Sequence, residues 1–94
     1  MLLSACSRDR RPDDVLSPLQ MSEFLTEAYR IEAYNSIVHP LMPDTINAET
    51  AAAYADLLQS QGLTQEQVEK SLDYYGHRPD QFEKILGDVL YRLQ

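Results

Sequence analysis

The sequence has few of the residue types that most often carry chemistry. It contains no tryptophan, one cysteine and three glycines in 94 residues. One cysteine cannot form an internal disulfide. The glycines at 62, 76 and 87 are too scattered to form a glycine-rich phosphate loop. No stretch approaches the roughly 18 consecutive apolar residues of a spanning helix, so we expect the domain itself not to cross a membrane.

Basic residues are also scarce. The chain has 8 Lys and Arg against 15 Asp and Glu, a formal net charge of −7. Three arginines balance three aspartates within the first 14 residues, so the rest of the chain carries the whole net charge. A negative surface repels phosphate backbones, and we therefore expect no nucleic-acid partner.

The sequence also offers no convincing catalytic or metal-binding motif. His39 and His77 lie in proline-containing connections, without a second ligand at metal-binding spacing. No serine stands in a Gly-x-Ser-x-Gly turn. Carboxylate pairs such as Glu23 and Glu27 are expected by chance in an acidic protein. We therefore predict a protein that is not an enzyme and needs neither metal nor cofactor.

The segment Leu3-Ser4-Ala5-Cys6 resembles the lipobox of bacterial lipoproteins, in which the cysteine is diacylated and becomes the mature N-terminus. Only Met1-Leu2 stands where a signal peptide has a basic segment and about 7 to 15 apolar residues, so we expect that the chain as given starts late. We interpret residues 1–6 as a signal remnant and Cys6 as the lipidation site. The alternative is an ordinary frayed terminus with a plain thiol.

Residues 7–16 are predicted to form a flexible, charged tether. Ser7 to Asp14 include no apolar residue, mix both charges and contain Pro12, so they cannot offset the entropy of ordering by burial. The arginines of this segment would then lie near lipid headgroups, where each can add about 1 kcal/mol of attraction to anionic lipid. A simple solvated charge run is the alternative.

Residues 17–94 show the pattern of a small all-α bundle of about four helices. Ser17-Pro18 with Gln20 forms a capping box that begins a helix over about 18–36. A second helix covers about 48–61 and ends at Gly62. A second capping box follows at once, in Leu63-Thr64-Gln65-Glu66-Gln67-Val68, and predicts a tight helical hairpin over about 48–75. A fourth helix is expected over about 79–93.

Apolar residues at helical spacing give each helix one face toward a common core. These faces consist of Met21, Phe24, Leu25, Ala28 and Ile31; Ala51, Tyr54, Leu57 and Leu58; Val68, Leu72 and Tyr75; and Phe82, Ile85, Leu86, Val89, Leu90 and Leu93.

Two polar residues, Glu32 and Asn35, fall inside the first apolar stripe. A charge there is costly unless it is paired. A hydrogen bond or ion pair with Arg30, a tyrosine hydroxyl or a neighbouring helix end would satisfy these groups. A role in binding is the alternative.

The chain has six tyrosines beside two phenylalanines, and tyrosine suits rims and interfaces. Tyr91 lies opposite the stripe of the last helix, and Tyr74 lies about 100° from the stripe that contains Tyr75, so some rings should be exposed. Partner contact and core rim are equally good explanations. The candidate partner-surface or buried polar positions are Glu32, Tyr34, Asn35, Tyr74, Tyr75 and Tyr91.

Three segments carry a resemblance to a known family: Gly62 to Tyr75, Arg78 to Ile85, and Glu32-Ala33-Tyr34. With the lipobox at the front, they resemble a family of small Bacteroidetes lipoproteins whose domain has no assigned function. The resemblance covers most of residues 12–94. It implies a helical domain on a lipid anchor in the cell envelope, and the sequence departs from it in lacking a full signal peptide.

The sequence therefore predicts a lipid-anchored protein of the bacterial cell envelope, at the outer membrane, that binds another envelope protein as an accessory subunit. The alternative is a periplasmic folding helper that holds unfolded chains in a groove between helices. A small-molecule enzyme would need a concave pocket of about 300 Å³ or more with converging polar groups.

Overall fold

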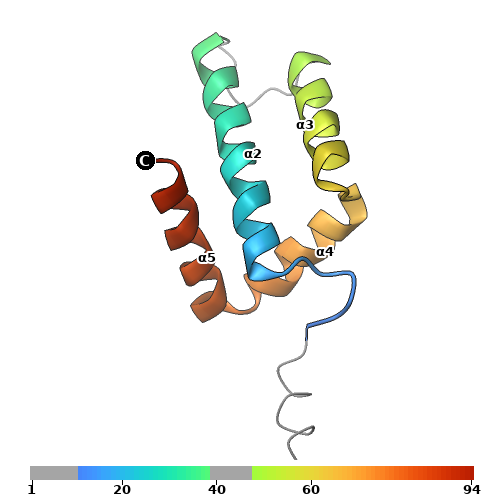
Figure 1. Cartoon of the computed structure of the whole chain (residues 1–94), viewed down its shortest axis with the longest axis vertical. Helices are drawn as coiled ribbons and strands as arrows, with labels where there is room; N and C mark the ends of the chain where they lie inside the picture. The colour runs from blue at the N-terminus through green and yellow to red at the C-terminus, as the bar shows by residue number, and fades with distance from the viewer. Residues whose placement is uncertain (1–10, 39–47) are drawn as a thin grey trace, which may run out of the picture.

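The computed structural model describes residues 11–38 and 48–94. This part of the chain contains four helices and no strand (Figure 1). The helices are α2 (Pro18–Val38), α3 (Ala48–Gln61), α4 (Gln65–Gly76) and α5 (Pro79–Arg92). The prediction of a small all-α bundle is confirmed. The largest difference in the predicted bounds is at the end of α2, expected near residue 36 and observed at Val38.

Both predicted capping boxes are present. The Ser17 amide donates to Gln20 Oε1 at 2.9 Å, and the Gln20 amide donates to Ser17 Oγ at 3.1 Å. Thr64 and Gln67 form the same reciprocal pair at the start of α4. Such pairs satisfy backbone donors that a helix start leaves without partners. Gly62 has a φ of 67°, so it adopts the left-handed conformation that ends α3.

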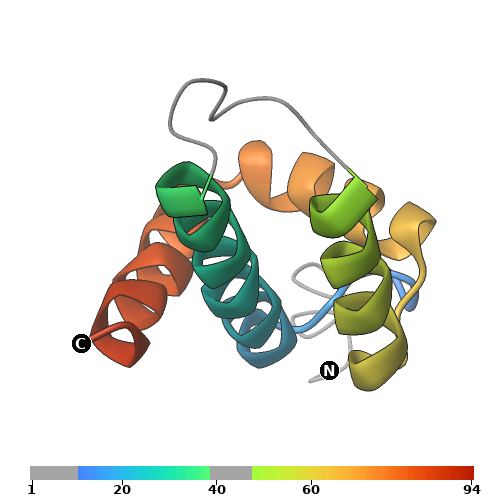
Figure 2. The same ribbon diagram turned by 90° about the horizontal axis from the view of Figure 1, so that it is seen from above.

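α2 lies between α3 and α5 (Figures 1 and 2). α3 runs antiparallel to α2, whereas α5 runs roughly parallel to it. α4 crosses the bundle near the N-terminal end of α2 and leads from α3 to α5. This crossing helix allows two segments that are distant in the sequence, α2 and α5, to pack side by side.

The prediction of a short turn between α3 and α4 is correct. The prediction that these two helices pack against each other as a hairpin is wrong. The turn between α3 and α4 is short, because α4 begins at Gln65 directly after its capping residue Thr64. However, α4 turns across the end of the bundle (Figures 1 and 2). It packs against α5, while α3 packs against α2. The reason is that the buried side of α4 contacts the segment before α2, as described below.

The core takes side chains from all four helices and from the segment before α2. Its buried apolar members are Val15, Leu16, Met21, Phe24, Leu57, Val68, Tyr75, Ile85 and Val89. The seven of these that lie in helices were all expected from the apolar stripes. Leu72, Leu90 and Leu93 were also expected to face the core, but they are 41%, 62% and 37% exposed. Their stripes are wider than the surface that the neighbouring helices cover.

Residues 11–16 form a strap that packs on α4, so the prediction of a flexible tether through residue 16 is wrong for this part. Val15 and Leu16 are buried at 6% and 2% exposure. The Leu16 amide donates to Ser71 Oγ at 2.8 Å, and Tyr75 Oη donates to the Leu16 carbonyl at 2.7 Å. Two apolar residues suffice to hold the strap because the Ser71 and Tyr75 side chains of α4 also satisfy the backbone N–H and C=O of Leu16. The remaining tether residues, 7–10, and the lipobox with Cys6 lie outside the described residues.

Substituting Tyr75→Phe tests how strongly the strap is held. The change removes the donor to the Leu16 carbonyl in a buried site, so we expect a loss of about 1–3 kcal/mol in the free energy of unfolding. Urea denaturation followed by circular dichroism measures it. The matched control is Tyr91→Phe, whose ring is 75% exposed and which should change stability by less than about 0.5 kcal/mol. Equal effects of the two substitutions would contradict the described role of Tyr75.

Candidate functional site

Asn35 is held at the interface of α2 and α3. Its side chain is 3% exposed, and Thr50 is 5% exposed. Thr50 Oγ1 donates to Asn35 Oδ1 at 3.1 Å. The expectation that a neighbouring element satisfies Asn35 is therefore confirmed. Burying a hydrogen-bonded polar pair between two helices also fixes their relative position, because any shift would leave the pair without its partners.

Glu32 also pairs with α3, one helical turn away from Asn35. Tyr54 Oη donates to Glu32 Oε2 at 2.5 Å. A tyrosine hydroxyl was one of the partners that the sequence analysis proposed for Glu32. Glu32 is exposed, although the sequence placed it in the buried stripe. Burial, and then the hydrogen bond and charge of Glu32, raise the pKa of the Tyr54 hydroxyl. The hydroxyl thus stays protonated and keeps donating.

Beside these contacts, α2 and α3 enclose a surface hollow of about 360 Å³, here named the α2–α3 trough. Ile31 and Ala53, both half-buried, line it together with Tyr34, which is 56% exposed. Glu27, Arg30, Glu49 and Thr50 complete its lining. Tyr34 therefore contributes an aromatic ring to an accessible hollow.

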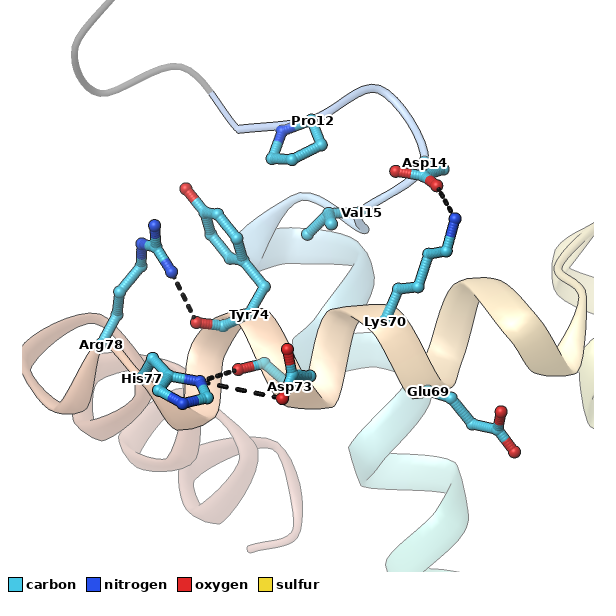
Figure 3. A pocket seen from close by; sticks show the side chains of 9 residues that line it. All are labelled: Pro12, Asp14, Val15, Glu69, Lys70, Asp73, Tyr74, His77 and Arg78. Atoms are coloured by element: carbon cyan, nitrogen blue, oxygen red, sulfur yellow. Dashed lines mark hydrogen bonds and ion pairs between the residues drawn. The ribbon is translucent and has the colours of Figure 1, made fainter.

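A second hollow, of about 520 Å³, lies where the strap crosses α4; it is named the α4 depression (Figure 3). Pro12 and Val15 of the strap lie over the helix, between Tyr74 and Lys70 (Figure 3). Its full lining is Pro12, Asp14, Val15, Glu69, Lys70, Asp73, Tyr74, His77 and Arg78. Glu69 points away from the other side chains in this view (Figure 3).

The aromatic part of the α4 depression is built from two tyrosines and an arginine. The rings of Tyr74 and Tyr75 meet edge to face, with centroids 5.1 Å apart. The Arg78 guanidinium lies 3.6 Å from the centre of the Tyr74 ring and donates to the Tyr74 carbonyl at 2.9 Å. Cation–π contact of this kind stabilises the pair by about 0.5–1 kcal/mol at exposed sites. Burial raises the pKa of the Tyr75 hydroxyl, which keeps it protonated as the donor to Leu16.

The charged groups of the α4 depression contact one another. Lys70 Nζ lies 2.6 Å from Asp14 Oδ2 and 3.6 Å from Glu66 Oε2. The hydrogen bond from Lys70 lowers the pKa of the Asp14 carboxyl. His77 Nδ1 lies 3.8 Å from Asp73 Oδ1 and 2.8 Å from the Asp73 carbonyl oxygen. These contacts fasten the strap and the end of α4, so they give the depression a structural explanation.

The six candidate side chains do not come together in one site. Glu32, Tyr34 and Asn35 lie on the C-terminal half of α2, Tyr74 and Tyr75 lie on α4, and Tyr91 lies on α5. Tyr75 is 1% exposed and belongs to the core. Tyr34 and Tyr91 are exposed, as a partner surface requires, and Tyr74 is half-buried. Cys6 and His39 lie outside the described residues.

Sequence reasoning missed several residues that shape these surfaces. Ser71 and Thr50 are small and polar, so a search for apolar stripes passes over them, although both are buried. Ile37 is 77% exposed, and its spacing of three residues from Tyr34 could have shown a second, outward apolar strip on α2. Asp14 and Lys70 carried no signal, because 56 residues separate them.

Within residues 11–38 and 48–94, no three His, Cys, Asp or Glu side chains are grouped closely enough to hold a metal ion. In the same part of the chain, every helix is too short or too polar to span a bilayer.

A family model for a domain of unknown function, DUF4296, matches residues 12–94. The chain belongs to the DUF4296 family. The match begins in the strap at Pro12, so the DUF4296 domain includes the segment that packs on α4 together with all four helices. No curated protein and no solved structure matches the chain.

The ion pair between Asp14 and Lys70 predicts a pH-dependent contribution to the stability of the DUF4296 domain. The pKa of Asp14 is lowered in the folded state, so the pair stabilises the fold above the ordinary aspartate pKa of about 3.9 and loses its effect as the pH falls below it. Wild type should therefore exceed Asp14→Asn in urea stability at neutral pH and low salt. The difference should shrink below about pH 4 and vanish once the Asp14 carboxyl is protonated in the folded state as well.

Lys70→Gln should remove the same pH-dependent difference, and Glu83→Gln, at an exposed position on α5, controls for the loss of one negative charge. A difference between wild type and Asp14→Asn that persists unchanged to about pH 2 would show that the ion pair is not its source.

Proposed function

We propose that the protein is a lipid-anchored, non-catalytic accessory subunit of the bacterial cell envelope that docks on a partner protein. The observation that carries the docking role is the outward strip on α2. Tyr34, Ile37 and Val38 are 56%, 77% and 42% exposed, and they lie three and four residues apart on one helix. Adjacent exposed apolar side chains of this kind are typical of interaction sites. The core is built from other residues, so folding does not require this strip.

The lipobox-like Leu3-Ser4-Ala5-Cys6 and the resemblance to small Bacteroidetes lipoproteins support the anchor and its place at the outer membrane. Because the strap is fixed to α4, the chain between Cys6 and the folded domain is short. From Cys6 to Arg11, where the strap begins, a fully extended chain spans at most about 18 Å. A lipid on Cys6 would hold the domain close to the bilayer and raise its effective concentration toward a partner in the same membrane.

The dimensions of the α2–α3 trough favour docking over a general chaperone role. A folding helper needs an apolar groove that accepts a long unfolded segment. The trough has a volume of about 360 Å³, near the lower end of binding clefts, and it suits a few side chains of a defined partner. In the α4 depression, Lys70 pairs with Asp14 and His77 with Asp73, which supports a structural role for that surface.

Lipidation is tested by expressing the gene from its natural start in its own host, beside a Cys6→Ala version. Intact mass and membrane fractionation are measured. We expect wild type to carry the added mass of acyl chains and to sediment with membranes, and Cys6→Ala to lose both.

Tyr34→Ala is the matched control, because it alters the proposed docking strip and should leave acylation and sedimentation unchanged. An unacylated wild-type product in the soluble fraction would overturn the lipoprotein proposal.

A further inference from the structure

The α2–α3 trough combines an apolar lining with an aromatic wall. Ile31 and Ala53 lie half-buried along it, and the Tyr34 ring stands beside them at 56% exposure. The bonded pair Asn35 and Thr50 fixes the spacing of the two helices. The trough is therefore held open by buried contacts.

The surroundings of the trough are acidic. α3 contains Glu49 and Asp56 and no basic residue. α2 contains three glutamates and one basic residue, Arg30. Arg30 also lines the trough, where it forms an ion pair with Glu27, so these two charges offset each other. With all ionisable side chains counted, α2 and α3 together carry five carboxylates and one guanidinium. The potential over this face is accordingly negative, and it attracts basic groups.

We propose that the α2–α3 trough binds an amphipathic helical segment of a partner protein, with aliphatic side chains in the trough and Lys or Arg along its edges. This inference names the chemistry of the partner in the docking role proposed above. An amphipathic helix laid in a groove uses apolar anchors at helical spacing, and opposite charge fixes its register. The trough offers both, since Ile31, Tyr34 and Ala53 supply apolar surface and the two helices that form it are net acidic.

The charge of the domain argues against two other occupants. A second copy of the chain would bring two faces of the same net negative charge together, and like charges in contact are unfavourable. An anionic lipid surface would be repelled by the same carboxylates. A basic protein segment meets neither obstacle.

The proposal is tested with a synthetic helical peptide of about four turns, with leucine at the buried positions and lysine at the others. A matched peptide carries glutamate in place of lysine. Fluorescence anisotropy with the purified full-length chain measures both affinities. We expect the lysine peptide to bind at least about tenfold more tightly, and its affinity to fall as salt rises from about 50 to about 500 mM.

Amide shifts in ¹⁵N-labelled protein locate the peptide. The largest changes should fall on Ile31, Tyr34 and Ala53. Tyr34→Ala should weaken binding about five- to tenfold, whereas Tyr34→Phe, which keeps the ring, should stay within about twofold of wild type. The double variant Glu27→Gln, Glu49→Gln should lose most of the salt dependence. The amide spectra show directly that each variant is folded.

Two matched controls lie outside the trough, on α5. Tyr91→Ala removes an equally accessible ring, and Glu83→Gln removes an exposed carboxylate. Neither should change the affinity by more than about twofold. Losses equal to those of the trough variants, or peptide-induced shifts centred on α5, would show non-specific charge attraction and overturn the proposal.

Three further outcomes also overturn the proposal. They are a lack of peptide binding, a concentration-dependent dimer in sedimentation that Tyr34→Ala abolishes, and saturable binding to phosphatidylglycerol vesicles that depends on Tyr34. The peptide assay needs no lipid, so its failure would leave the Cys6 anchor standing. Conversely, an unacylated wild-type chain that still binds the peptide at the trough would remove the anchor and keep this inference.

Discussion

α2 has to bury different sides of one helix against two neighbours, and the other elements are arranged around that requirement. Toward α5 it presents Ser22, whose side chain lowers the pKa of the Asp88 carboxyl after the larger effect of Arg92. Toward α3 it presents Asn35, bonded to Thr50. Small or polar side chains at these points let the helices meet without leaving polar groups unsatisfied. α4 and the strap then close the end of the bundle.

The sequence predicted what depends on neighbours in the chain. Capping boxes at Ser17 and Thr64, and the left-handed Gly62, involve residues within a few positions of each other, so their patterns are visible locally. The packing direction of α4 depends on Leu16, whose partners Ser71 and Tyr75 are 55 and 59 residues away. No local pattern encodes such a pairing, and for this reason the strap and the crossing of α4 were not foreseen.

The candidate site was predictable to a similar extent. Glu32 and Asn35 stood out because polar groups interrupt an apolar stripe, and the structure supplies the partners that this pattern demands. The exposure of Tyr91, opposite the apolar stripe of α5, was predicted correctly, whereas that of Tyr34 could not be predicted, since it depends on how far α3 covers α2. Tyr75 is covered by the strap, whereas α3 leaves Tyr34 at the edge of an accessible trough.

The parallel pairing of α2 with α5 also sets an order of events during synthesis. The first helix of the described chain finds one of its two main neighbours in the last one, and the Arg30 guanidinium reaches the Arg92 carbonyl 62 residues later. A nascent chain therefore holds one side of α2 uncovered until its C-terminal helix has emerged. The bundle therefore closes late in synthesis, after the last helix has left the ribosome.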